Sequence, residues 1–301
     1  MSRAPGELWD PGRMVDEFEE LRRRMFGLAY RMLGSAAEAE DVVQDAYLRW
    51  HTADRRNVET PGAWLAKVVT NLCLNRLTAA RATRESYVGP WLPEPVESAA
   101  LGPLETAERR DAVSMAFLTL LERLTPPERA VFVLREAFSY GYREIAEVLD
   151  LSETHCRQLL IRARKRMGEP RRFDVPGEQR HRIVERFLDA ARGGDLAELE
   201  RLLAVDVVVW SDGGGRVSAA LRPVEGRDKV VRFLAGIAAK FGPGGGFAHT
   251  EVNGEEGIVV WVEDVVVAVF AIEVTDGRIT GVRAVLNPDK LSRFTAPGCQ
   301  E

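Results

Sequence analysis

Within residues 152–165, six polar and charged side chains have the chemistry that contact with duplex DNA requires. Amide and guanidinium groups can hydrogen-bond to base edges in the major groove, and arginine or lysine cations can pair with backbone phosphates. A serine that caps a helix N-terminus leaves neighbouring amide groups facing outward, where a phosphate can bind. We therefore predict a DNA-binding helix whose contact residues are Ser152, His155, Arg157, Gln158, Arg162 and Lys165.

These six residues are not expected to act alike. Arg157 and Gln158 are the best candidates for reading bases, while Arg162 and Lys165 are expected to hold the backbone. For His155, contact with DNA and simple exposure to solvent remain equally open.

Two helices and a tight corner must present this set. One helix is expected over 142–150, and a second begins after Ser152. The second helix has an apolar face, because hydrophobic residues recur at intervals of three and four. The short corner lets the two apolar faces meet, as a helix-turn-helix requires. The residues of the second apolar face are Cys156, Leu160, Ala163 and Met167.

The charge distribution supports a local DNA-binding surface. The 301-residue chain has a formal net charge of −5, yet positions 157–172 contain seven Arg or Lys and a single acid, Glu169. A content of 46% hydrophobic and 29% charged residues is ordinary for a soluble globular protein. The three widely spaced cysteines predict neither disulfides nor a zinc site. We expect a cytoplasmic protein with no membrane span, metal or cofactor.

Periodicity divides the chain into four parts. Helical patterns dominate the first and third parts, and prolines interrupt the second. In the last part, helices precede Val- and Ile-rich strands, which indicates a cone-shaped α+β domain. The expected parts are a helical bundle over 14–84, a linker over 85–105, a helix-turn-helix module over 106–170 and an α+β domain over 176–296.

Specific strands and turns are expected in the last part. Residues 207–210 and 217–221 are predicted to form strands on either side of a glycine-rich turn. Asn253-Gly254 and Asp276-Gly277 are hairpin signals, and Glu263-Asp264 is a plausible third turn. The result would be an antiparallel meander.

The helical bundle has two further candidate surfaces. An acidic segment at 38–45 suits a basic surface on a partner, although such charge runs are also common on solvated helix faces. Trp50 and Trp64 could stack on bases, but the phase of Trp64 with neighbouring apolar residues favours a core position. The next helix offers amides and cations that could hold an unpaired strand, namely Lys67, Thr70, Asn71, Asn75 and Arg76.

Several motifs in order resemble the extracytoplasmic-function (ECF) sigma factors of bacterial RNA polymerase. They are residues 39–46 with Trp50, residues 61–65 with Asn71, and the helix-turn-helix that opens at 125–129. Three more segments are similar to signatures of the SigJ-type subgroup, which carries a fused SnoaL/NTF2-like domain. These segments are 91–95 (Trp-Leu-Pro-Glu-Pro), 212–215 (Asp-Gly-Gly-Gly) and 287–291 (Asn-Pro-Asp-Lys-Leu).

The resemblance implies a fold and a set of partners. The expected fold is multidomain, with two all-α sigma domains and a C-terminal α+β cone-shaped domain of SnoaL/NTF2-like type. The partners would be promoter DNA and core RNA polymerase, through the clamp coiled coil of its largest subunit and its β flap. The acidic helix would dock on the clamp through Glu40, Asp41, Gln44 and Asp45.

The resemblance also divides DNA recognition between the helical domains. The first domain would open the −10 promoter element and capture an unstacked base with the 54–60 loop, and the second would read the −35 element. The polymerase would carry out the catalysis, so the chain itself is not expected to be an enzyme.

The fused domain is expected to act on the other two in cis, without a separate anti-sigma protein. Residues from the linker, the glycine turn and the C-terminal motif would carry this regulation. They are Trp91, Pro93, Asp212, Gly213, Asn287, Asp289 and Lys290.

Two other classes of protein remain open from the residues alone. Cone-shaped folds hold pockets, so the C-terminal domain could be a small-molecule isomerase or hydrolase. Alternatively, the chain could be a helix-turn-helix repressor that never contacts polymerase. The proton-moving residues of such an isomerase or hydrolase would be Asp206, Asp212, His249 and Glu251, which show no recognisable pairing.

Overall fold

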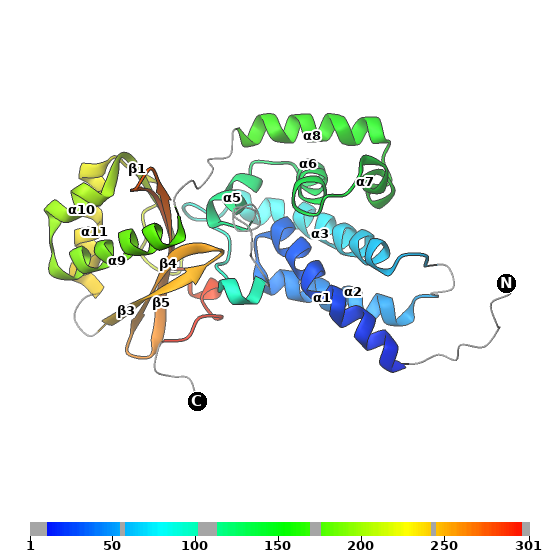
Figure 1. Ribbon diagram of the computed structural model, residues 1–301, viewed down its shortest axis with the longest axis horizontal. Coiled ribbons are helices and arrows are strands. Elements are labelled where there is room, and N and C mark those ends of the chain that lie inside the picture. The colour runs from blue at the N-terminus through cyan, green and yellow to red at the C-terminus, as the bar shows by residue number, and fades with distance from the viewer. Residues whose placement is uncertain (1–10, 55–57, 102–112, 169–175, 242–244, 297–301) are drawn as a thin grey trace.

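Two helical modules and one sheet domain make up the chain (Figure 1). The computed structural model describes residues 11–54, 58–101, 113–168, 176–241 and 245–296. The order of elements, helices first and a curved sheet last, confirms the predicted fold class. None of the helices in these ranges is long and apolar enough to cross a membrane.

The first module contains three helices, and residues at their ends stop or cap them. Gly34 adopts φ +67° and ends the first helix, a conformation that costs glycine little. Ser35 Oγ then accepts a hydrogen bond from the Glu38 amide at 3.2 Å and caps the next helix. The helices are α1 (Pro11–Leu33), α2 (Ala36–Thr52) and α3 (Pro61–Glu85).

The second module contains the predicted helix-turn-helix. Thr125 and Glu128 form a capping box that starts its second helix, and Asp150 adopts the left-handed conformation (φ 54°) at the corner. A short 3₁₀ turn, η2 (Ser98–Leu101), precedes this module. The elements are α5 (Met115–Leu121), α6 (Pro126–Phe132), the π-helical turn η3 (Val133–Ala137), α7 (Tyr142–Leu149) and α8 (Glu153–Met167).

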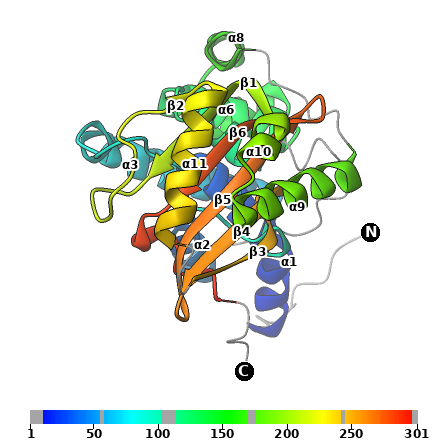
Figure 2. The ribbon, with the colours of Figure 1, turned by 90° about the vertical axis from the view of Figure 1, so that its left-hand side faces the viewer.

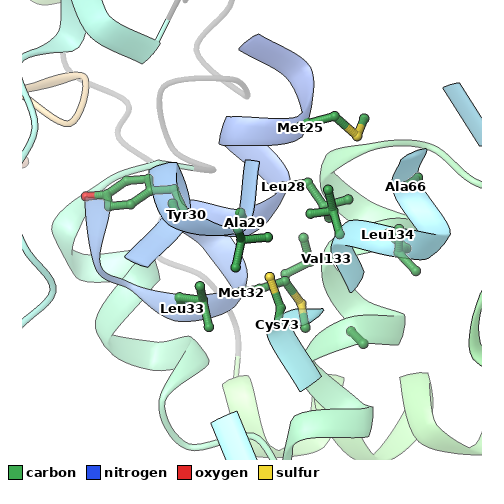
Figure 3. Packing of buried hydrophobic residues seen from close by; sticks show 14 of the residues in the cluster. Met25, Leu28, Ala29, Tyr30, Met32, Leu33, Ala66, Cys73, Val133 and Leu134 are labelled. Carbon is green, nitrogen blue, oxygen red and sulfur yellow. The ribbon is translucent and has the colours of Figure 1, made fainter. Parts of the chain in front are cut away.

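Both helical modules share one apolar core (Figure 3). Met32 of α1 and Cys73 of α3 lie in the same cluster as Val133 and Leu134 of η3, and all four are buried. Arg129 of α6 crosses the boundary, donating to the Met32 carbonyl at 2.8 Å. The two modules therefore pack as a single body, because separating them would expose apolar surface from both.

The C-terminal domain has three helices on one face of a six-stranded sheet (Figure 2). The strand order is β2-β1-β6-β5-β4-β3, and all neighbours are antiparallel except β1 and β6. The helices are α9 (Gly177–Gly193), α10 (Leu196–Leu202) and α11 (Arg227–Phe241). The strands are β1 (Leu203–Asp212), β2 (Val224–Glu225), β3 (Gly245–Val252), β4 (Glu255–Val262), β5 (Val265–Thr275) and β6 (Arg278–Val285).

The hairpin turns of the sheet are confirmed, and one expected strand is wrong. Asn253, Glu263 and Asp276 adopt positive φ at the three predicted turns. Residues 217–221 do not form a strand, because the position beside β1 is taken by β2. Val217 instead continues the glycine turn, with its amide bonded to the Gly213 carbonyl at 3.2 Å.

The sheet face opposite the helices packs on the rest of the chain. Leu92 of the linker and Met115 of α5 are fully buried against Val259, Val269 and Val285 of this face. This apolar patch and the polar contacts around it join the sheet domain to the helical modules.

Candidate functional site

Helix α8 presents the predicted DNA-contact residues to solvent. It lies at the outer edge of the helical body (Figure 1), with all six predicted contact residues exposed. Ser152 Oγ accepts from the His155 amide at 3.2 Å, which confirms the predicted N-cap. Cys156, Leu160 and Ala163 are buried, so the apolar face of α8 points inward as expected.

Arg157 has contacts of its own on this surface. Its guanidinium pairs with Glu153 at 3.1 Å and lies 4.7 Å from the centre of the Tyr142 ring. The pair is exposed, so its contribution to stability is small and the side chain is free to exchange partners. Gln158, Arg162 and Lys165 form the rest of an exposed, basic helix face.

Thr70, a predicted DNA contact, is not accessible in this arrangement of the modules. Its side chain is fully buried in α3, where the helix packs against other helices, and its Oγ1 has no hydrogen-bond partner among the described residues. Asn71 is half-buried and Asn75 is exposed. Trp50 is buried, which confirms its expected core position, and its ring centre lies 5.4 Å from that of Trp64, which is half-buried and packs against the same core.

Lys67 links the two helical modules instead of standing free. Its ammonium lies 2.8 Å from Asp150 Oδ1 and donates to the Glu147 carbonyl at 2.8 Å, both at the end of α7. The part of α3 predicted to hold a DNA strand is therefore next to the helix-turn-helix module.

Arg76 links the predicted DNA-binding surface of α3 to the predicted polymerase-binding surface of α2. It pairs with Asp45 at 3.1 Å and with Asp41 at 3.5 Å, and it donates to the Glu38 carbonyl. Its predicted role was DNA binding, whereas the two aspartates were assigned to polymerase. The predicted 54–60 loop beside these helices lies partly outside the described residues.

Asp212 is the centre of the contact between the linker and the sheet domain. Its carboxylate is fully buried at the end of β1. Oδ2 accepts from the Leu92 amide at 2.9 Å and pairs with Lys290 Nζ at 2.7 Å. Oδ1 accepts from Tyr87 Oη at 2.6 Å and from the Gly214 amide at 3.0 Å. Four donors compensate the buried charge, as a buried carboxylate requires.

The three signature segments meet at this carboxylate. Lys290 also donates to the Leu92 carbonyl, and its ammonium lies 4.3 Å from the centre of the Trp91 ring. Asn287 donates to Tyr87 Oη at 3.1 Å. Burial and the neighbouring Asp212 raise the pKa of Tyr87, so its hydroxyl stays a donor. The residues predicted to carry regulation are thus brought together from three distant parts of the chain.

The glycine turn fits closely against its neighbours. A Cβ on Gly213 would lie 2.5 Å from the Val217 carbonyl oxygen. Gly214 has φ +59°, and a Cβ there would meet the Asn287 side chain at 2.3 Å. Pro93 is buried in the linker, and Asp289 pairs with Arg216 of the turn at 3.3 Å. Glycine is required at 214 because Asn287 of the C-terminal motif approaches so closely, and at 213 because the turn folds back on itself at Val217.

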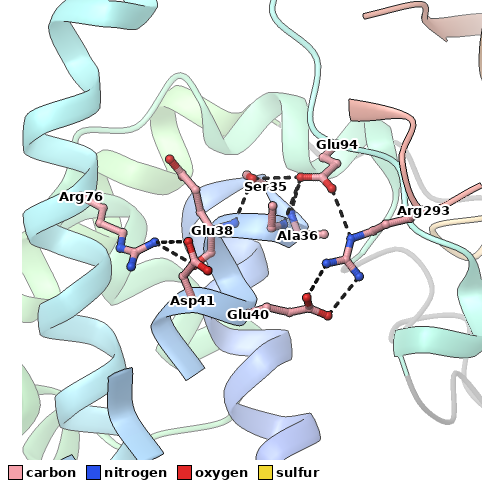
Figure 4. Close-up of polar contacts among 9 residues, drawn as sticks. Ser35, Ala36, Glu38, Glu40, Asp41, Arg76, Glu94 and Arg293 are labelled. Carbon is pink, nitrogen blue, oxygen red and sulfur yellow. Dashed lines mark hydrogen bonds and ion pairs between the residues drawn. The ribbon is translucent and has the colours of Figure 1, made fainter. Parts of the chain in front are cut away.

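A second polar cluster surrounds the start of α2 (Figure 4). Glu94 is buried, and its Oε2 accepts from the amides of Ala36 and Ala37 at 2.8 and 3.1 Å. Arg293 pairs with Glu94 at 3.3 Å and holds Glu40 at both carboxylate oxygens, at 3.0 and 2.7 Å. The Arg293 hydrogen bond lowers the pKa of Glu40, and burial acts against it. The C-terminal segment is therefore fixed to the helix predicted to bind polymerase.

The turn between β3 and β4 forms a third contact. Asn253 is fully buried and donates to Tyr30 Oη at 2.7 Å and to the Val113 carbonyl at 2.9 Å. Its Oδ1 accepts from the Val96 amide at 3.0 Å. Sequence reasoning identified Asn253 only as a turn residue, included Glu94 only as part of the 91–95 segment, and missed Tyr30 and Arg293 entirely. Their partners are distant in the chain, so no local signal distinguishes them.

The proton-moving candidates do not form one site. Asp206 and Glu251 are exposed, and Asp212 is used in the linker contact. His249 lies instead beside His181 and Glu256. No hydrogen bond or ion pair joins any two of the four candidates among the described residues, although His249 contacts the carboxylate of Glu256.

Comparison with known proteins identifies both helical modules. Residues 18–83 match the family model for sigma-70 region 2, and residues 114–167 match that for sigma-70 region 4. These matches coincide with the bundle and with the helix-turn-helix module described above.

Full-length relatives share the third domain as well. The chain is 39% identical over 291 residues to the ECF RNA polymerase sigma factor SigJ of Mycobacterium tuberculosis, covering 92% of this chain and 93% of that protein. It is 30% identical to SigI of the same species, covering 91% and 93%. The crystal structure of M. tuberculosis SigJ superposes with a TM-score of 0.74 at 35% identity, covering 93% of this chain and 98% of that one. The chain belongs to the ECF RNA polymerase sigma factors, which are transcription initiation factors and not enzymes.

Proposed function

We propose that this sigma factor binds core RNA polymerase, directs it to promoters with −10 and −35 elements, and is held in a closed form by its own C-terminal domain. The acidic face of α2 would dock on the clamp coiled coil of the largest subunit, and the helix-turn-helix module would dock on the β flap. The names of the full-length relatives support the polymerase partner, and the exposed basic face of α8 supports the DNA partner.

The closed form follows from the packing of the helical modules. The two promoter elements are about 25 base pairs apart, or about 85 Å along B-form DNA at about 3.4 Å per base pair. Modules that share one core and are joined by Lys67 and Asp150 cannot span that distance. Productive binding therefore requires the helix-turn-helix module to leave α3.

One observation carries the proposal of regulation in cis. Arg293, beyond the last strand of the sheet domain, holds both oxygens of Glu40 on α2. Glu40 is one of the residues assigned to polymerase binding, and this contact occupies its carboxylate. The buried Asp212 contacts and the Asn253 turn hold the same domain in place. Polymerase would compete with Arg293 for Glu40 and its neighbours.

Transcription in a defined system tests both parts of the proposal. Core polymerase and a promoter library would be combined with the intact chain, with Arg293→Ala, or with Arg232→Ala, an exposed arginine of α11 that serves as the control. We expect promoter-specific transcripts with all three, and several-fold more at limiting protein with Arg293→Ala.

The two parts fail in different ways. If the intact chain directs no promoter-specific initiation, the polymerase function is wrong. If initiation occurs and Arg293→Ala behaves like Arg232→Ala, the function stands and the proposed lock is wrong.

A further inference from the structure

Two of the four histidines and one glutamate converge on the surface of the sheet domain. His181 comes from α9, His249 from β3 and Glu256 from β4. The distance from His181 Nδ1 to His249 Nε2 is 3.3 Å, and that from His181 Nδ1 to Glu256 Oε2 is 3.4 Å. His249 Nε2 also contacts Glu256 Oε2. The three ligand atoms lie within 4.8 Å of one another.

A fourth residue orients the first histidine. Glu185 lies one turn along α9, and its Oε1 is 3.2 Å from His181 Nε2. This carboxylate favours the tautomer with hydrogen on Nε2, which leaves the Nδ1 lone pair pointing toward His249 and Glu256. Metal-binding histidines are commonly oriented by a carboxylate in this way.

Two of the three ligand-to-ligand distances suit a tetrahedral ion, while His249 Nε2 and Glu256 Oε2 are in direct contact and must move apart to admit one. With zinc-to-ligand bonds of about 2.0–2.1 Å, the ligand atoms of a tetrahedral site are about 3.3–3.4 Å apart. Both distances from His181 Nδ1 have this length. We propose that His181, His249 and Glu256 bind a divalent transition-metal ion of the Zn²⁺ class, with Glu185 as the residue that positions His181. Imidazole ligands favour such ions over Mg²⁺ or Ca²⁺.

The site is open to solvent on one side. The side chains of His181 and His249 are 41% and 30% exposed, and that of Glu256 is 14% exposed. An ion can therefore enter without unfolding, and three protein ligands leave a fourth position for water. An ion here would join α9 to the β3–β4 hairpin, whose turn at Asn253 lies against Tyr30 of α1. The inference does not depend on the proposed function.

Calorimetric titration of Zn²⁺ into the full chain tests the site. Cys299→Ser serves as the background, so that this thiol cannot compete for the ion. We expect one ion per chain. Binding should weaken at least tenfold in His249→Ala and in His181→Ala, and about 10- to 100-fold in Glu185→Gln, the loss typical of an orienting residue. His51→Ala, an exposed histidine of α2, should bind as the background does.

Two further readouts separate metal binding from a folding defect. Co²⁺ in place of Zn²⁺ should give the visible absorption of a tetrahedral nitrogen and oxygen site in the background and in His51→Ala, and not in His249→Ala. Zn²⁺ should raise the Tm of the background and of His51→Ala, and not that of His249→Ala, because an ion that binds the folded chain stabilises it. Without metal, the variants should melt close to the background. Absence of stoichiometric binding, or binding that is unchanged in both histidine variants, would overturn the proposal.

Discussion

Lys290 Nζ lies 2.7 Å from Asp212 Oδ2, and the Asp212 side chain is completely buried. The lysine belongs to the C-terminal motif, the aspartate ends β1, and the linker amide of Leu92 shares the same oxygen. A single carboxylate thus holds together segments that are 78 and 120 residues away in sequence. Loss of this charge should loosen the sheet domain from the helical modules.

Asp212→Asn tests the importance of that carboxylate. The variant keeps the shape of the side chain but leaves Lys290 without its counter-charge, and breaking a buried pair in this way costs roughly 3–5 kcal/mol. We expect a loss of about that size in the free energy of unfolding, measured with denaturant. Asp206→Asn, an exposed acid on the same strand, is the control. Equal stability of the two variants would show that the contact contributes little.

Gln158 and Lys165 should differ in how they affect DNA binding. Gln158→Ala is expected to relax preference at one base pair of the −35 element, by about 1–3 kcal/mol. Lys165→Ala should weaken binding to all DNA sequences alike, and it should reduce the salt dependence of binding by about one phosphate contact. Binding to every single-base variant of a promoter, at several salt concentrations, measures both effects. A sequence-dependent loss in Lys165→Ala would reverse the assigned roles.

Thr70→Val should be tolerated or stabilising. The buried hydroxyl has no partner among the described residues, so its removal relieves an unpaired polar group and should add about 1 kcal/mol to the free energy of unfolding. Promoter opening tests separately whether Thr70 contacts DNA once the helix-turn-helix module has left α3. Thr78→Val, on the exposed side of α3, controls for the loss of a hydroxyl. Defective opening in Thr70→Val alone would restore Thr70 as a DNA contact.

The Glu40 contact should respond to acid. Because Arg293 lowers the pKa of folded Glu40 below its unfolded value, the contact stabilises the chain above that unfolded value, about 4.3. The stabilisation is lost as pH falls through the folded pKa. The Tm of wild type should therefore exceed that of Glu40→Gln by a small margin at pH 7, and the difference should shrink below about pH 4.3 and vanish once the pH is below the folded pKa of Glu40. A difference that persists in acid would exclude the charge as its cause.

Local signals in the sequence were enough to predict the helical modules and the hairpins. Ser152 caps a helix as expected, and Asn253 and Asp276 form hairpin turns as expected. Each of these features depends on neighbours within a few residues, which the sequence shows directly. The motif resemblance extended this reasoning to the regulatory segments.

Features that depend on distant partners could not be predicted. Thr70 has the polarity of a surface residue, and only the packing of α3 against other helices buries it. His181 and His249 are 68 residues apart, so no metal-ligand spacing marks them. Residues 217–221 have a strand pattern, but the competing pairing of β2 with β1 decides the fold there. In each case tertiary structure overrides the local preference.

The separation of the helical modules on a promoter tests the central claim most directly. Spin labels or fluorophores at Leu48→Cys on α2 and Arg143→Cys on α7 would report their distance in the Cys299→Ser background, since Cys73 and Cys156 are buried. The account predicts one short distance for the free chain and an increase on the order of tens of Å when core polymerase and promoter DNA are added. A distance that stays short in an actively initiating complex would contradict it.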